Sequence, residues 1–186
     1  MRWCVGWLAA LVAFAAAAGA QEPASFNLST NNCIVQFVIP GTWGGIKGEV
    51  KDLTGWARFR RPGDLNSLRG SIEMDVTAVT TGSGGRDQKW RNDCLEAGRF
   101  PKITFTLERI TVTEHQAFLL SGLLTIRDVT RSLVISGQFQ VKGGYYQLTG
   151  SGEMKWSDYG VRDASTLFTK VQPDTKVLLE LWLPAK

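Results

Sequence analysis

Residues that could carry out catalysis are few in this sequence, and they do not lie near one another. The chain of 186 residues has one histidine, His115, between Glu114 and Gln116. A metal site needs several convergent ligands and a catalytic base needs a partnered nucleophile, and the neighbouring positions supply neither. We interpret His115 as a solvent-exposed turn residue. We predict that the chain is not an enzyme and has no catalytic residues, no metal site and no cofactor.

The glycine-rich segment 82–85 is the other stretch that could suggest chemistry, because such loops can bind phosphate. It lacks the Gly-Lys-Ser/Thr ending of a P-loop and follows no βαβ pattern. We interpret it as a turn that leads into a helix. The charged residues after it, Arg86, Asp87 and Arg91, form either a structural cluster or one that faces an anion. A lipid hydrolase or isomerase would need a nucleophile–base pair, which the sequence does not indicate.

The first twenty residues have the pattern of a secretory signal peptide. Arg2 precedes the apolar run 5–18, and Ala18-Gly19-Ala20 fits the small-residue cleavage pattern. The run is shorter than the roughly 20 apolar residues that a membrane-spanning helix needs. We predict a signal peptide over residues 1–20, one mature domain over residues 21–186, and export from the cytoplasm.

Two cysteines, Cys33 and Cys94, remain after the predicted cleavage. An oxidising compartment favours a disulfide between them. Two buried, unpaired thiols are the alternative, because a disulfide also requires the two Cα atoms to lie within bonding reach.

The segment 82–101 differs from the rest of the chain because its side chains recur at helical spacing. Asp87 and Arg91 stand four residues apart, as do Trp90 and Cys94, so each pair meets on one helix face. Gly98 and Pro101 are typical helix stop signals. We expect one short helix there.

Nearly all of the remaining chain alternates apolar and polar residues, which predicts antiparallel β-strands. Between residues 103 and 112 the alternation changes phase, which is typical of a β-bulge. Turns are expected at 61–64, 114–116, 127–128 and 143–144. About eight strands with short connections predict an all-β fold, an eight-stranded antiparallel lipocalin-like barrel with the short helix closing one end.

The charge pattern argues against a nucleic-acid partner. The formal net charge is +4, and the basic residues are scattered without a polybasic tail. The aromatic residues are more informative, since some of them could line an apolar cavity inside a barrel, although a packed core is the simpler explanation.

Three ordered motifs resemble the YceI-like proteins, and the similarity spans about residues 26–183. The first motif is the longest and lies in and after the expected helix, and the other two follow it in order along the chain. They are Arg86-Asp87, Arg91, Asp93 and Arg99-Phe100-Pro101 with Ile103-Thr-Phe105; Gly122-Leu-Leu-Thr-Ile126 with Val129-Thr-Arg131; and Asp158-Tyr-Gly160.

The resemblance implies a lipocalin-like barrel, secretion or a periplasmic location, frequent dimerisation and no catalytic activity. Some members hold a long polyisoprenoid chain inside the barrel with its polar head toward the mouth. The resemblance therefore implies a ligand site formed by the short helix, which acts as a lid, and by the barrel interior. It also implies a group of basic residues near the mouth of the barrel. The interior candidates are Trp90, Leu95, Phe100, Phe105, Leu124, Ile126, Trp156 and Tyr159, and the head-group candidates are Arg86, Lys89, Arg91 and Arg99.

The sequence departs from the family pattern at several positions. Asn32-Cys33 stands where a His-Ser pair is usual, Gly41-Thr42 where a further histidine is usual, and Cys94-Leu95 where aromatic residues are usual. The two cysteines thus occupy two matched positions, and this favours a Cys33–Cys94 disulfide.

We expect the protein to bind an apolar, chain-like ligand, an isoprenoid lipid or isoprenoid quinone, inside the barrel. The alternative is a filled barrel whose outer surface docks a membrane redox partner. That alternative would bring a peripheral membrane contact or a membrane-protein contact. A homodimer is compatible with both hypotheses.

Overall fold

The computed structural model describes residues 25–42, 44–61, 63–163, 165 and 170–185. The expected signal peptide, residues 1–20, lies outside the described residues. Within the described part no helix is long and apolar enough to cross a membrane.

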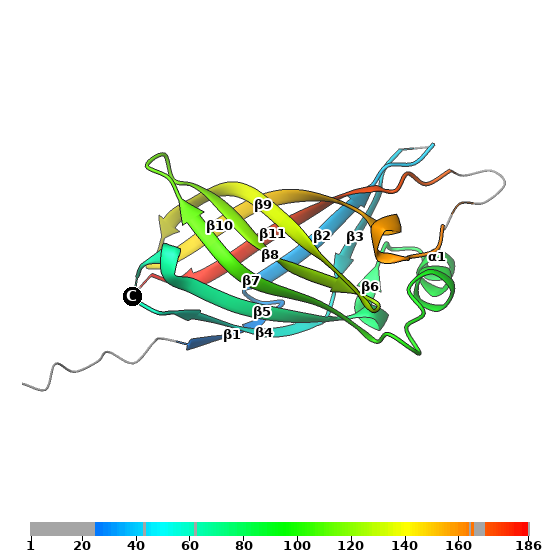
Figure 1. The fold of residues 1–186 in the computed structure, drawn as a ribbon, viewed down its shortest axis with the longest axis horizontal. Coiled ribbons are helices and arrows are strands. Elements are labelled where there is room, and N and C mark those ends of the chain that lie inside the picture. The colour runs from blue at the N-terminus through cyan, green and yellow to red at the C-terminus, as the bar shows by residue number, and fades with distance from the viewer. Residues whose placement is uncertain (1–24, 43, 62, 164, 166–169, 186) are drawn as a thin grey trace, which may run out of the picture.

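The described residues form one antiparallel sheet of eleven strands, which curls into a barrel (Figure 1). The sheet order is β1-β4-β5-β7-β8-β9-β10-β11-β2-β3-β6. The strands are β1 (Ser25–Ser29), β2 (Cys33–Ile39), β3 (Ile46–Val50), β4 (Leu53–Phe59), β5 (Leu68–Asp75), β6 (Val79–Thr80), β7 (Lys102–Val112), β8 (Ala117–Ile126), β9 (Val129–Lys142), β10 (Tyr145–Lys155) and β11 (Asp174–Pro184).

The strand count differs from the expected eight because some extended stretches are interrupted. Strands β3 and β4 follow each other with only Lys51 and Asp52 between them, and the 3-10 turn η2 (Val76–Ala78) separates β5 from β6. Strand β1 pairs with β4, whereas the next strand, β2, pairs with β3 on one side and β11 on the other. The chain therefore passes from one end of this sheet order to the other between β1 and β2, and again between β3 and β4.

The expected short helix is present at one end of the barrel (Figure 1). It consists of α1 (Gly84–Lys89) and a following π-helical turn, η3 (Trp90–Cys94). The helical segment ends at Cys94, before the expected stop at Gly98, and Glu96 just beyond it has a left-handed backbone (φ 53°). A non-glycine residue at positive φ is uncommon. Its side chain pairs with Arg127 and Arg162, so this conformation coincides with a tertiary contact.

The predicted phase change in the strand after the helix is confirmed as a β-bulge. In the β7–β8 pair the register moves from Leu107 opposite Gly122 to Arg109 opposite Ser121, so Glu108 is the extra residue. The bulge lets Leu107 and Ile110 both point into the core despite their odd spacing, and each is less than a tenth exposed.

The turn predictions are also confirmed where the structure describes them. His115 is exposed in the turn between β7 and β8. Arg127 and Asp128 connect β8 to β9. Gly143 and Gly144 connect β9 to β10, both at positive φ (59° and 82°), which glycine adopts without a steric penalty.

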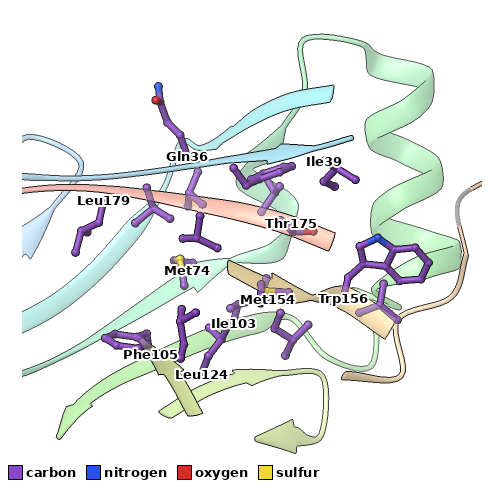
Figure 2. Close-up of a pocket in the computed structure, with 18 of the residues that line it drawn as sticks. Gln36, Ile39, Met74, Ile103, Phe105, Leu124, Met154, Trp156, Thr175 and Leu179 are labelled. Atoms are coloured by element: carbon purple, nitrogen blue, oxygen red, sulfur yellow. The ribbon is translucent and has the colours of Figure 1, made fainter. Parts of the chain in front are cut away.

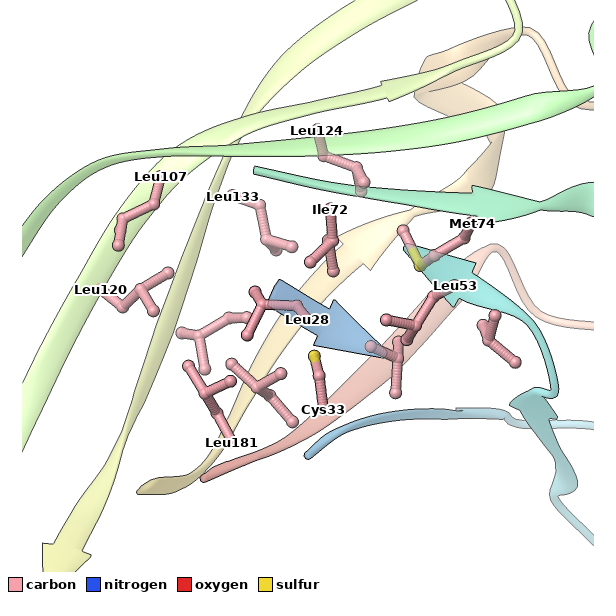
Figure 3. Close-up of a cluster of buried hydrophobic side chains, with 14 of the residues drawn as sticks. Leu28, Cys33, Leu53, Ile72, Met74, Leu107, Leu120, Leu124, Leu133 and Leu181 are labelled. Carbon is pink, nitrogen blue, oxygen red and sulfur yellow. The ribbon is translucent and has the colours of Figure 1, made fainter. Parts of the chain in front are cut away.

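The barrel interior is packed unevenly along its axis. At the end away from the helix, Leu148 and Leu183 are 0% exposed and Phe59 is 1% exposed. An aromatic cluster continues this packing, since Phe59 contacts Phe26 and Tyr146 edge to face, with ring centroids 5.7 and 6.2 Å away. Figure 3 shows the adjoining cluster, in which Leu28, Cys33 and Leu181 converge. Toward the helix, inward-facing side chains keep partial exposure, which indicates empty space between them; they include Phe37, Trp90, Ile103, Phe105, Met154 and Val177.

Candidate functional site

The empty space is a cavity of about 120 Å³ beneath the helical segment (Figure 2). Strands from all sides of the barrel and the helical segment contribute to its wall. Its lining residues are Val35, Gln36, Phe37, Ile39, Val50, Ile72, Met74, Val79, Trp90, Leu95, Ile103, Phe105, Leu124, Ile126, Leu133, Ile135, Met154, Trp156, Val161, Thr175, Val177 and Leu179.

The polar groups among these residues are already satisfied or point elsewhere. The indole Nε1 of Trp156 donates to the carbonyl oxygen of Gln172 at 2.8 Å. The Thr175 hydroxyl donates to the carbonyl oxygen of Pro173 at 3.5 Å. The amide of Gln36 is exposed and points away from the cavity (Figure 2). A polar ligand would lose its bonds to water here without gaining replacements, so the cavity suits an apolar ligand.

Most of the interior residues expected from the sequence lie in the cavity wall: Trp90, Leu95, Phe105, Leu124, Ile126 and Trp156. Phe100 and Tyr159 do not. The Phe100 ring lies beneath the guanidinium groups of Arg99 and Arg127, 4.9 and 5.2 Å from its centroid. Tyr159 is 2% exposed and is packed in the core. Burial raises the pKa of its hydroxyl above the ordinary value, and the nearby charge of Asp158 adds to the shift.

Several lining residues were absent from the expected set. Phe37 stacks on Trp90 with ring centroids 6.2 Å apart, and Met154, Val177 and Leu179 complete the wall. The signal that could have found them is the period-two pattern itself, because Val35, Phe37 and Ile39 alternate on one face of β2. The expected set was restricted to aromatic and motif residues, and it therefore missed most positions on this face.

None of the four basic head-group candidates lines the cavity. Arg86 donates to the hydroxyl and the carbonyl oxygen of Thr81, at 2.7 and 2.9 Å. Arg91 donates to the carbonyl oxygen of Val79 at 3.1 Å, and Arg99 stacks on Phe100. These three side chains position the helical segment. For Lys89, the fourth, no hydrogen bond or ion pair is found among the described residues.

Asp87 anchors the helix to the strand before it. The residue is 5% exposed, and its carboxylate accepts hydrogen bonds from the Thr80 hydroxyl at 2.7 Å, the Thr81 amide at 2.8 Å and the Thr81 hydroxyl. Burial acts to raise the pKa of Asp87, but the hydrogen bonds from Thr81 and Thr80 and the charge of Arg91 outweigh it and hold the pKa below its usual value. Asp87 is therefore a structural anion rather than a general acid.

Arg127 joins the end of the helical segment to two other loops. Its guanidinium donates to Glu96 Oε1 at 2.8 Å and to the carbonyl oxygen of Gly160, and it covers the Phe100 ring. The side chains of Arg127 and Glu96 are only 13% and 19% exposed. Arg162 approaches the same carboxylate oxygen at 3.4 Å. This cluster fastens the helical segment to the barrel rim.

The expected Cys33–Cys94 disulfide is wrong, because both residues are free and buried thiols. Cys33 begins β2 opposite Leu181, deep in the packed half of the barrel, whereas Cys94 ends the helical segment beyond the far end of that strand. The length of β2 lies between them, about 20 Å for seven residues, far more than a disulfide spans. Burial raises the pKa of Cys33 to about 12, so its thiol stays protonated.

The described residues that line the cavity include no histidine, cysteine or charged side chain. Among the described residues there is no cluster of three or more histidine, cysteine or acidic side chains that could hold a metal ion. What the cavity can offer a ligand is burial of the ligand's apolar surface.

Comparison with known structures supports the same fold. The chain is similar to BcnA of Burkholderia cenocepacia (17% identity, TM-score 0.72, covering 81% of this chain and 96% of that one). It is also similar to a YceI protein of Campylobacter jejuni (20% identity, TM-score 0.64, 76% and 85% covered). A polyisoprenoid-binding domain of Saccharophagus degradans matches with 14% identity and a TM-score of 0.63, covering 89% and 100%.

The comparison with curated proteins gives no match. The model of the YceI-like domain, however, matches residues 26–183, which is nearly all of the part that the structure describes. The chain therefore belongs to the YceI-like family.

Proposed function

We propose that this protein binds an apolar, chain-like molecule, an isoprenoid lipid or isoprenoid quinone, in the cavity between the helical segment and the packed half of the barrel. The observation that carries the proposal is a hollow, apolar interior whose polar groups, those of Trp156 and Thr175, already have partners. Each methylene group transferred from water into such a cavity stabilises the complex by about 0.8 kcal/mol. A hydrocarbon chain therefore needs few polar contacts.

The family relationship supports the same class of ligand. The structurally similar domain from Saccharophagus degradans is described as polyisoprenoid-binding.

The strand pairings support a lipocalin-like, eight-stranded interpretation of the barrel. In that interpretation β1 with β2, β3 with β4, and β5 with β6 each form one interrupted strand.

The size of the cavity limits how the ligand is held. At about 120 Å³ it is smaller than the roughly 300–1,000 Å³ of typical ligand pockets. We infer that it encloses one end of the chain and that the remainder extends toward the helical segment. A charged head group would then lie outside the cavity near Lys89, which is the one candidate cation not engaged with Thr81, Val79 or Phe100.

We also propose that residues 1–20 direct the protein to the periplasm, where a soluble carrier would shield such a ligand from water. Attachment of a reporter enzyme after residue 20 tests this directly. The proposal requires the reporter to be exported and the leader to be removed after Ala20.

Native mass spectrometry of the protein purified from its own cells, followed by organic extraction, tests the ligand proposal. A discrete added mass that solvent releases, and that is identified as an isoprenoid, is the expected result. A bare protein mass that remains bare after incubation with farnesol and with a long-chain quinone would refute it.

A further inference from the structure

A second, smaller cavity lies next to the first along the barrel. It has a volume of about 40 Å³ and lies in the direction of the packed half. Cys33, Leu120 and Leu181 line this second cavity and not the first. Figure 3 shows these three side chains together with Leu28. The two cavities share the lining residues Ile72, Phe105 and Leu179.

These three shared residues come from different sides of the barrel. Ile72 and Phe105 are direct partners in the β5–β7 register. Leu179 belongs to β11, which is separated from β7 by β8, β9 and β10 in the sheet order. Figure 2 shows Phe105 and Leu179 at the end of the first cavity farthest from Trp156 and the helix. The shared residues therefore stand between the two empty spaces.

The orientation of the Phe105 ring depends on a glycine. A Cβ atom placed on Gly122 would lie 2.5 Å from Cζ of the Phe105 ring and 2.4 Å from the carbonyl oxygen of Thr106. Gly122 is opposite Leu107 in the sheet, and Leu107 lines the second cavity. The ring thus leans over Gly122 toward the second cavity and occupies the space through which the two cavities would otherwise join.

We propose that Phe105, with Ile72 and Leu179, is a partition that sets the length of hydrocarbon chain the barrel accepts. The inference rests on the proposed function, and it adds a specificity-determining residue to it. A chain that enters from the helical end ends its path at Phe105. The opposite end offers no route, because the aromatic cluster of Phe26, Phe59 and Tyr146 fills it and the Tyr146 hydroxyl is fixed to the carbonyl oxygen of Gly63 at 2.6 Å.

The test compares farnesol with geranylgeraniol, which is longer by one isoprene unit, through the fluorescence of Trp90 and Trp156. The wild-type protein is expected to bind both with similar affinity, because the added unit finds no space beyond the partition. In Phe105→Ala the two cavities join. Geranylgeraniol is then expected to bind roughly tenfold more tightly than farnesol, the equivalent of burying about two more methylene groups. Leu179→Ala should change the ratio in the same direction, which provides a second variant if Phe105→Ala folds poorly.

Ile103→Ala is the matched control, because Ile103 lies on the same face of β7 but lines the first cavity alone. It should leave the affinity ratio unchanged. A position readout completes the design. A farnesol analogue with a diazirine at its tail should label residues of the first cavity in the wild type, and Cys33 or Leu181 in Phe105→Ala.

The outcomes separate the two proposals. If the wild type binds farnesol but Phe105→Ala and Leu179→Ala keep the wild-type ratio and labelling sites, the partition is refuted and the binding function stands. A wild-type preference for geranylgeraniol of tenfold or more also refutes the partition. Absence of binding of either alcohol refutes the proposed function for this ligand class, and the partition with it.

Discussion

Leu123 and Leu124 are adjacent on β8 and offer a sharp test of which face of the sheet binds ligand. Leu124 lines the cavity and is 5% exposed, whereas Leu123 points outward and is 38% exposed. We predict that Leu124→Asn destabilises the protein by about 3–6 kcal/mol. About 2–3 kcal/mol of this comes from lost apolar burial, at the lower end of the usual range because the side chain borders a cavity. The remaining 1–3 kcal/mol or so comes from burying an amide without partners.

The same change at the neighbouring position is the control. Leu123→Asn should alter the free energy of unfolding by no more than about 0.5 kcal/mol, because its side chain is at the surface. Urea denaturation measures both values. For a domain of this size the melting temperature of Leu124→Asn should fall by roughly 6–24 °C.

Ligand binding should distinguish the two variants in the same way. In Leu124→Asn an arriving hydrocarbon chain loses the apolar contact with the leucine side chain, about 1–2 kcal/mol, which should weaken farnesol binding by roughly five- to 30-fold. Leu123→Asn should bind as the wild type does. Wild-type affinity in folded Leu124→Asn, or an equal loss in Leu123→Asn, would refute the assignment of the cavity as the ligand site.

Three further predictions concern the groups that hold the fold. Arg127→Met removes the buried partner of Glu96 and should lower the free energy of unfolding, measured in urea, by about 2–3 kcal/mol. Arg61→Met, at an exposed ion pair with Asp64, should lower it by less than about 1 kcal/mol. Equal effects of the two changes would contradict the role of Arg127 at the barrel rim. Because folding lowers the pKa of Asp87, its contribution is present above the unfolded value of about 3.9 and is lost as the pH falls. Asp87→Asn should therefore be less stable than the wild type at pH 7 by roughly 2 kcal/mol. This difference in stability should shrink as the pH falls below about 4, and a pH-independent difference would argue against the linkage. Folding raises the pKa of Cys33 to about 12, so as the pH rises the thiol ionises first in the unfolded protein. The free energy of unfolding should therefore decline above about pH 9 in the wild type, and decline less in Cys33→Ala. Iodoacetamide should modify Cys33 only after the protein unfolds.

Much of the fold follows from local pattern, and so the sequence could predict it. Alternation of apolar and polar residues is a property of consecutive positions, because successive side chains on a strand point to opposite faces. The bulge at Glu108, the turn at Gly143 and Gly144 and the helix before Gly98 are equally local features. The three motifs between residues 86 and 160 indicated the family, and the match of the family model to residues 26–183 confirms it.

The candidate site was predictable only in outline. Period-two alternation tells that Phe105 and Leu107 point inward, but not that one borders a cavity of about 120 Å³ and both border a smaller one. Volume left empty is a sum over side chains from distant strands, such as Leu179 on β11, and no single segment encodes it. We expected Phe100 to line the cavity because it belongs to the first family motif. In the structure its ring lies under the guanidinium groups of Arg99 and Arg127 instead.

The sequence by itself determined the class of protein: an antiparallel β fold with one short helix, without catalytic chemistry indicated by residue pattern. The tertiary structure decided what the polar and sulfur-containing side chains do. Arg86 and Arg91 hydrogen-bond to neighbouring backbone carbonyl groups, and Cys33 and Cys94 lie too far apart to bond. The physical reason is range: strand and turn preferences act between neighbours in the chain, whereas hydrogen bonds, disulfides and cavities depend on distances that only the closed sheet sets.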